Sequence, residues 1–150
     1  MFSKKTIHFI IYHSHSYYPV NEEITQEIAS TAHPNNIDKG FTGMLLATEN
    51  SFIQYIEGEG LEELESLFEK IKNDTRHEIS FFYKGVSDFR VFSKWSMGAW
   101  YMQPDELDGL EGFNSLKLCL NNNLHEETSA QTFLELMESI LSIWSLKNKK

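Results

Sequence analysis

The chain has 150 residues and a formal net charge of −9 at pH 7, from 22 acidic and 13 basic residues. Such an acidic surface repels phosphate backbones and anionic lipids, so we expect neither direct nucleic-acid binding nor a standing association with membranes. The lone cysteine, Cys119, excludes an intrachain disulfide and a cysteine metal cluster, and the apolar run Ile7–Tyr12 is too short for a signal peptide or a transmembrane helix, so a cytoplasmic location is expected.

The first elements predicted along the chain are a strand and a helix. Ile7–Tyr12 is rich in β-branched and aromatic residues, as strands are. Asn21 is a suitable N-cap and is followed by two glutamates that complement the helix dipole. Pro34 is expected to end that helix, which makes Asn35-Asn36 the loop after it. Residues at four-residue spacing predict one inward-facing apolar stripe: Ile24, Ile28 and Ala32.

A hairpin, a second helix and two more strands follow. The strand-like runs 41–48 and 51–57 are separated by Glu49-Asn50, which is a hairpin signal. Further strands are predicted at 79–86 and from near Trp95 to about residue 102. The second helix is predicted from apolar residues at helical spacing: Leu61, Leu64, Leu67, Phe68 and Ile71.

The order β-α-β-β-α-β-β is that of a ferredoxin-like α+β fold with one added strand, in which two helices cover one face of a five-stranded mixed sheet. We expect the first and third strands to be parallel neighbours. Pro104 and the glycines after it mark a boundary, so we predict one domain over 1–103 and an extension of about two helices over 104–150. The apolar face of 133–144 is expected to fold back on the sheet, with an oligomer as the alternative.

Hydrolytic and metal-dependent chemistry has little support in the sequence. None of the six histidines has the helical spacing of a zinc site, and His13 and His15 are expected in a solvated loop at a strand end. No Walker or Rossmann glycine pattern occurs, and neither Arg76 nor Arg90 lies in a glycine-rich anion loop. We therefore expect no metal and no catalytic residues.

A polar residue interrupts the apolar pattern of the third strand. Alternation places Gln54 on the same face as Phe52 and Ile56, so if that face meets the helices, the amide is buried and needs partners. Tyr12 shares a face with Ile10 on the neighbouring first strand, and its hydroxyl could satisfy one side of the amide. From alternation alone, a self-satisfied Tyr–Gln pair or a sheet face turned to solvent is the favoured interpretation.

Several motifs occur together in an order that is typical of one family. They are Ile-Ile-Tyr12-His-Ser; Asn35-Asn36; Thr42-Gly43 leading into Leu45-Leu46; Phe52-Ile-Gln54-Tyr-Ile-Glu57-Gly58; Asp74-Thr-Arg76-His77; and Arg90-Val-Phe92-Ser-Lys-Trp95-Ser-Met97. With these motifs, over roughly residues 5–102, the chain resembles the BLUF domain, the flavin-binding blue-light sensor of bacteria and some algae.

The resemblance implies that a flavin binds without a covalent bond between the two helices, with its ring edge toward the sheet. The cofactor would be FAD, although FMN or riboflavin is also possible. Ile28 and Ile71 would be walls of its site. Asn35 and Asn36 match amides that bind the pyrimidine edge of the ring, and two further residues match positions near the flavin phosphate: Arg76 and His77.

The resemblance also implies the photochemistry. Tyr12 and Gln54 match the pair in which the excited flavin takes an electron and a proton from tyrosine and the glutamine amide reverses or tautomerises. The resulting red shift of the flavin absorption would be reversible in the dark. Trp95 and Met97 match strand residues that rearrange near the glutamine and pass the signal outward.

We therefore expect a short blue-light receptor rather than an enzyme, because about 50 residues after the sensor are too few for a cyclase or phosphodiesterase domain. Its output would be a change in affinity for a protein partner. Two alternatives stay open: a flavin-free interaction module with the same fold, and a small flavin enzyme, against which the missing Rossmann pattern argues.

Overall fold

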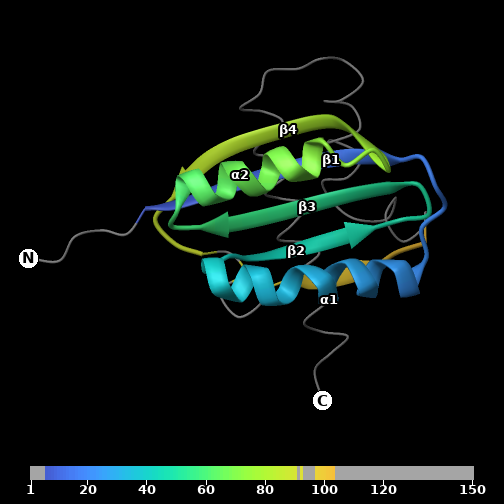
Figure 1. Cartoon of the computed structure of the whole chain (residues 1–150), viewed down its shortest axis with the longest axis horizontal. Helices are drawn as coiled ribbons and strands as arrows, with labels where there is room; N and C mark the ends of the chain where they lie inside the picture. The colour runs from blue at the N-terminus through green and yellow to red at the C-terminus, as the bar shows by residue number, and fades with distance from the viewer. Residues whose placement is uncertain (1–5, 91, 93–96, 104–150) are drawn as a thin grey trace, which may run out of the picture. The chain divides into compact units, whose positions relative to one another are not determined.

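The computed structural model describes residues 6–90, 92 and 97–103. The five strands of this part form one sheet in the order β4-β1-β3-β2-β5, with both helices in front of it (Figure 1). This confirms the predicted ferredoxin-like arrangement of two helices on a five-stranded sheet. The elements are β1 (Ile7–Ser16), α1 (Glu22–Lys39), β2 (Thr42–Ala47), β3 (Ser51–Gly58), α2 (Leu61–Lys72), β4 (His77–Ser87) and β5 (Gly98–Tyr101).

The predicted direction of the β1–β3 pair is wrong. The two strands are antiparallel, with His8 opposite Gly58 and His15 opposite Ser51. The crossover through α1 makes β2 run in the same direction as β1, and the tight turn after β2 reverses β3. Because β3 lies between β1 and β2, it is antiparallel to both. The sheet is nevertheless mixed as predicted, since β5 pairs in parallel with β2.

The first helix starts where the sequence predicts but ends later. The side chain of Asn21 caps it by accepting a hydrogen bond from the N–H of Ile24 at 2.8 Å. Pro34 lies inside the helix, which ends only at Gly40, where φ is 73°. The proline removes one backbone hydrogen bond, to the carbonyl of Ser30, but that residue is exposed and water can replace the lost donor. The last turn therefore carries Asn35 and Asn36 as helical residues.

At the centre of the sheet both faces carry buried apolar side chains, whereas on the edge strand β4 Phe82 and Val86 are exposed. On the face toward the helices, Ile10, Tyr12 and Ile56 pack in one cluster with two residues of α2, Leu64 and Phe68. On the opposite face Met44, Ile53 and Tyr55 are at most 2% exposed, and the ring of Phe9 stacks on that of Tyr55 with centroids 5.3 Å apart. Alternate residues along a strand therefore point either toward the helices or toward the opposite face of the sheet.

Two predictions fall outside the described residues. The start of the last strand near Trp95 is one, and the helical extension over 104–150 is the other. The described part of that last strand is Gly98–Tyr101.

Neither helix of the described part of the chain combines the length and apolarity needed to cross a membrane.

Candidate functional site

A cavity of about 660 Å³ lies against the helix-facing side of the sheet, between α1 and α2. This size is typical of sites for small ligands and cofactors. The predicted stripe of α1 and the facing residues of α2 form apolar walls: Ile24, Ile28, Ala32, Leu67 and Ile71. The sheet contributes Tyr12, Leu45, Phe52, Gln54 and Ile56. The stripe of α1 thus faces a cavity rather than packed core, and the fully buried residues of that helix are others: Thr25, Ala29 and Asn36.

Tyr12 and Gln54 meet at the sheet side of this cavity. They are direct cross-strand partners on β1 and β3, and only 5% and 6% of their surfaces are exposed. The Tyr12 hydroxyl donates to Gln54 Oε1 at 2.5 Å. Burial, together with the negative charge of Asp74, raises the pKa of Tyr12, so the hydroxyl stays protonated and acts as the donor. The predicted contact between the two side chains is therefore present, on a buried face.

The other side of the Gln54 amide has only a weak partner. Gln54 Nε2 donates to the thioether sulfur of Met97 at 3.5 Å, and a thioether is a poor acceptor. Among the described residues, these two contacts are all that the amide makes. A glutamine between a tyrosine hydroxyl and a sulfur can turn without breaking more than one strong hydrogen bond.

Met97, which contacts Gln54, is the residue directly before β5. The ladder pairs Gly98 with Met44, which places Met97 next to Gly43, on the side of β2 that faces the cavity. Gly43 presents no side chain there, and a Cβ on it would lie 2.1 Å from the carbonyl oxygen of Tyr55. Trp95, the other residue expected to transmit the signal, lies outside the described residues.

Asn35 and Asn36 both line the cavity from the last turns of α1. Asn36 is 1% exposed, whereas Asn35 is exposed. Their position in a helix rather than a loop fixes the backbone that carries both amides, because the carbonyl of Asn36 accepts from the N–H groups of Gly40 and Phe41. The two amides therefore project from a rigid scaffold.

If Asn36 binds a flavin, as the sequence resemblance implies, Asn36→Ala is expected to weaken that binding about tenfold or more, because roughly one to two net hydrogen bonds to the ligand would be lost. Alanine is a good helix former, so α1 should persist. Titration of the stripped protein with FAD measures the change, with Gln26→Ala, an exposed residue of α1 that does not line the cavity, as the control. An unchanged Kd for Asn36→Ala would remove this residue from the site.

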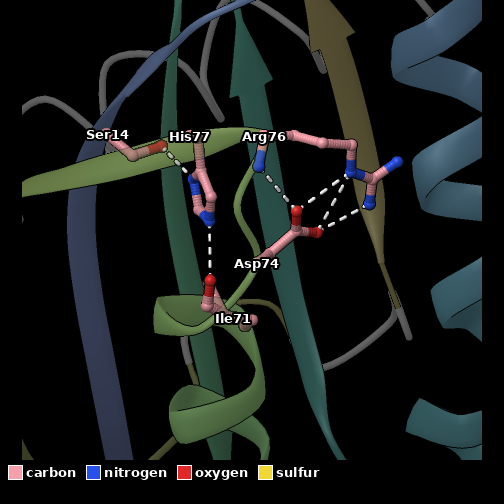
Figure 2. Close-up of polar contacts among 5 residues, drawn as sticks. All are labelled: Ser14, Ile71, Asp74, Arg76 and His77. Carbon is pink, nitrogen blue, oxygen red and sulfur yellow. Dashed lines mark hydrogen bonds and ion pairs between the residues drawn. The ribbon is translucent and has the colours of Figure 1, made fainter.

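Arg76 and Asp74 form an ion pair at the rim of the cavity (Figure 2). Arg76 Nη2 lies 2.7 Å from Asp74 Oδ2, and Arg76 Nε contacts both carboxylate oxygens. The hydrogen bonds from Arg76 lower the pKa of Asp74 to about 2. Asp74 holds the guanidinium beside the opening, where a phosphate could contact its remaining N–H groups.

His77 also lines the cavity, but both of its ring nitrogens are bonded to the protein (Figure 2). Nε2 lies 2.6 Å from the carbonyl oxygen of Ile71, which can only accept, so Nε2 carries the hydrogen. In the neutral ring Nδ1 then accepts from the Ser14 hydroxyl at 2.8 Å. His77 thus joins β1, β4 and the end of α2, and a phosphate would have to displace one of these bonds.

Some lining residues were not singled out from the sequence. Leu45 and Phe52 occur in the quoted motifs but read as core positions, and Lys70 reads as an ordinary surface cation on α2. Tyr18 follows a strand end and carries no motif signal. Only the placement of these residues around one cavity connects them.

Metal ligands do not cluster in the part of the chain that the structure describes. His13 and His15, predicted in a solvated loop, instead belong to β1. The His13 ring is hydrogen-bonded with the Ser80 hydroxyl, and burial, followed by the charge of His15, lowers its pKa to about 4.

Solved structures with the same fold include several light sensors. The structure "BlrP1 BLUF" is 26% identical with a TM-score of 0.61 and coverage of 87% of this chain and 86% of that one. A manganese and cyclic-diGMP complex of Klebsiella pneumoniae BlrP1 is 25% identical with a TM-score of 0.59; it is matched over 78% of this chain, which spans only 33% of that protein. BlrB, a BLUF protein in its dark state, shares the fold at 22% identity and a TM-score of 0.60, over 93% and 98% of the two chains.

No curated protein matches the chain. The family model for sensors of blue light using FAD matches residues 7–98, which include β1 through the start of β5 and all the described residues of the cavity. With that match over more than half of the sequence and with the fold of known light sensors, the chain belongs to the BLUF family of flavin-binding blue-light sensors.

Proposed function

We propose that Tyr12 and Gln54 are the photochemical pair of this sensor and that FAD binds in the cavity between α1 and α2. The observation that carries the proposal is the buried Tyr12–Gln54 hydrogen bond at the sheet side of that cavity, with a weakly held amide nitrogen beside it. Neither the Tyr12 hydroxyl nor the Gln54 amide is needed there for packing. An apolar pair would fill the same space without the cost of burying two polar side chains.

The residues around the cavity suit a flavin ring. Its walls include aliphatic side chains, with Ile28 on one helix and Ile71 on the other, and the amides of Asn35, Asn36 and Gln54 could supply both donors and acceptors for a polar ring edge. Arg76 would meet the phosphates at the rim. A bound flavin would supply, on absorbing blue light, an oxidant strong enough to take one electron from a nearby tyrosine.

The hydrogen bonds of Tyr12 and Gln54 support a specific part for the protein in the photochemistry. Tyr12 is the donor of the electron, and its proton leaves along the bond to Gln54 Oε1, the one acceptor that its hydroxyl has among the described residues. Reversal or tautomerisation of the Gln54 amide then exchanges donor for acceptor toward both Tyr12 and the cavity. Met97 Sδ loses or changes its contact with the amide, so the event reaches β5.

We further propose that the output is a light-dependent contact with another protein and that this chain itself catalyses no reaction. A change in β5 would shift the balance between two conformations of the protein, and these conformations would differ in their affinity for the partner. The net charge of −9 opposes direct contact with nucleic acid or anionic membranes. A cytoplasmic location fits this output, and self-association is one form that the contact could take.

Flavin extraction tests the cofactor. The purified full-length protein should be yellow and should release FAD on heating, identified by chromatography against FMN and riboflavin standards. A colourless protein that also fails to bind added flavin would favour the flavin-free interaction module. Steady oxidation of a reduced nicotinamide in the dark would favour the flavin enzyme.

A further inference from the structure

Glu57 is a fully buried carboxylate that the photochemistry does not use. It is 0% exposed and lies near the end of β3, three residues after Gln54. Strand alternation places it on the sheet face opposite the cavity, with Tyr55. Burying a carboxylate is costly unless it is well hydrogen-bonded, so its partners indicate what it holds in place.

The partners of Glu57 include the chain that connects β4 to β5. Glu57 Oε2 accepts from the backbone N–H of Phe92 at 2.7 Å and from the hydroxyl of Thr42, its neighbour across the β2–β3 ladder, at 2.8 Å. Thr42 Oγ1 in turn accepts from Arg90 Nη1 at 3.0 Å. Two residues of the connection, Arg90 and Phe92, are thus bound at one point of the sheet.

Apolar packing reinforces this attachment. Phe92 is 1% exposed, and its ring meets that of Tyr55 edge-on with centroids 5.3 Å apart. Hydrogen bonds to a carboxylate are stronger than neutral ones, and here a buried ring packs beside the bond. The backbone at Phe92 therefore has a fixed position relative to β3.

This fixed point lies only five residues before Met97. Five extended residues span at most about 17 Å, so an anchor at Phe92 restricts where Met97 can lie. The pairing of Gly98 with Met44 restricts it from the other side. Glu57 and Gln54 therefore hold the same segment from opposite faces of β3.

We propose that Glu57 is a positioning residue: it anchors Phe92 so that Met97 stays against Gln54, and it thereby sets how strongly the Gln54 amide is coupled to β5. The inference rests on the proposed function, because it takes Gln54 as the origin of the signal. Its first test, however, needs no light. Glu57→Leu keeps the volume and removes the acceptor, Glu57→Gln keeps an acceptor without the charge, and Thr42→Val removes only the hydroxyl.

The first measurement is hydrogen exchange at the Phe92 amide, resolved by NMR in the full chain. Glu57→Leu should speed this exchange about tenfold or more, and Glu57→Gln should speed it less, because its amide oxygen still accepts. Thr48→Val is the matched control for Thr42→Val. It removes the buried hydroxyl of Thr48, directly after β2, which is hydrogen-bonded with the Ser51 hydroxyl. Unchanged exchange at Phe92 in both Glu57 variants would refute the anchor.

The second measurement is the rate of dark recovery, in the Met97 and Met97→Ala backgrounds. Both Glu57 variants should keep flavin and the red shift, since Glu57 does not line the cavity. In the protein that keeps Met97, Glu57→Leu should change the recovery rate at least about threefold. In the Met97→Ala protein, adding Glu57→Leu should not change that rate further, because the effects of coupled residues are non-additive. If Glu57→Leu does not fold, Glu57→Gln carries the comparison with a smaller change.

The outcomes separate the two proposals. A wild-type protein without a red shift would contradict the proposed function, while exchange at Phe92 would still report on the anchor. A normal wild-type shift, together with a recovery rate that the Glu57 variants leave unchanged or alter equally without Met97, would overturn the positioning role alone.

Discussion

Gln54→Leu is expected to bind flavin and to show no blue-light-induced red shift. Leucine fills a similar volume, so the cavity should keep its shape, but it has no group that can exchange donor for acceptor. The Tyr12 hydroxyl also loses its acceptor, which costs about 1–3 kcal/mol of folding stability. Illuminated-minus-dark absorption spectra measure the shift, and thermal unfolding with bound flavin measures the cost.

A variant at the neighbouring position controls for disturbance of β3. Ile53→Val removes one methyl group from the opposite face of the strand, which should cost about 1 kcal/mol and leave the red shift intact. If Gln54→Leu shifted like the wild type, the glutamine would not be the group that changes its hydrogen bonds, and the assignment would fail.

Tyr12→Phe is expected to leave a bound flavin that fluoresces more strongly and whose red shift falls to under about a tenth of the wild-type amplitude, since phenylalanine has no hydroxyl proton to release. The ring stays in the cluster with Phe68, so packing should change little. Fluorescence yield and transient absorption on the same sample check both parts of this expectation.

Tyr55 offers a matched control for that substitution. It is another buried tyrosine, adjacent to Gln54 in sequence but on the other face of the sheet, where its ring stacks on that of Phe9. Burial and the nearby Glu57 charge raise its pKa, so it too stays protonated. Tyr55→Phe should preserve the red shift. Loss of the shift in both variants would mean that Tyr12 has no special role.

The sequence was sufficient to predict the order of the described strands and helices and to raise a Tyr12–Gln54 contact as one possibility, for a physical reason. Strand alternation is a local rule, so the polar Gln54 on an apolar face was visible without any tertiary knowledge. The direction of β1 against β3 depends on the crossover and hairpin together, and there the local argument failed. Whether the amide was self-satisfied depended on its second partner, Met97, which no short-range pattern identifies.

Two other features could not have been predicted from local signals. Pro34 is a helix breaker by propensity, but α1 continues past it because the lost bond lies on an exposed side and Asn36 is buried in the next turn. Glu57 reads as a polar residue at a strand end before a glycine. Only the tertiary structure brings Phe92 to its carboxylate, 35 positions further along the chain.

The central claim is that this chain is a flavin photosensor that works through Tyr12 and Gln54, and a blue-light difference spectrum of the full-length protein tests it most directly. The account predicts flavin absorption in the dark, a small red shift on illumination, and complete thermal return without bleaching, because no covalent bond forms. A flavin-loaded protein whose spectrum does not shift, or whose absorbance is lost and does not return, would contradict it.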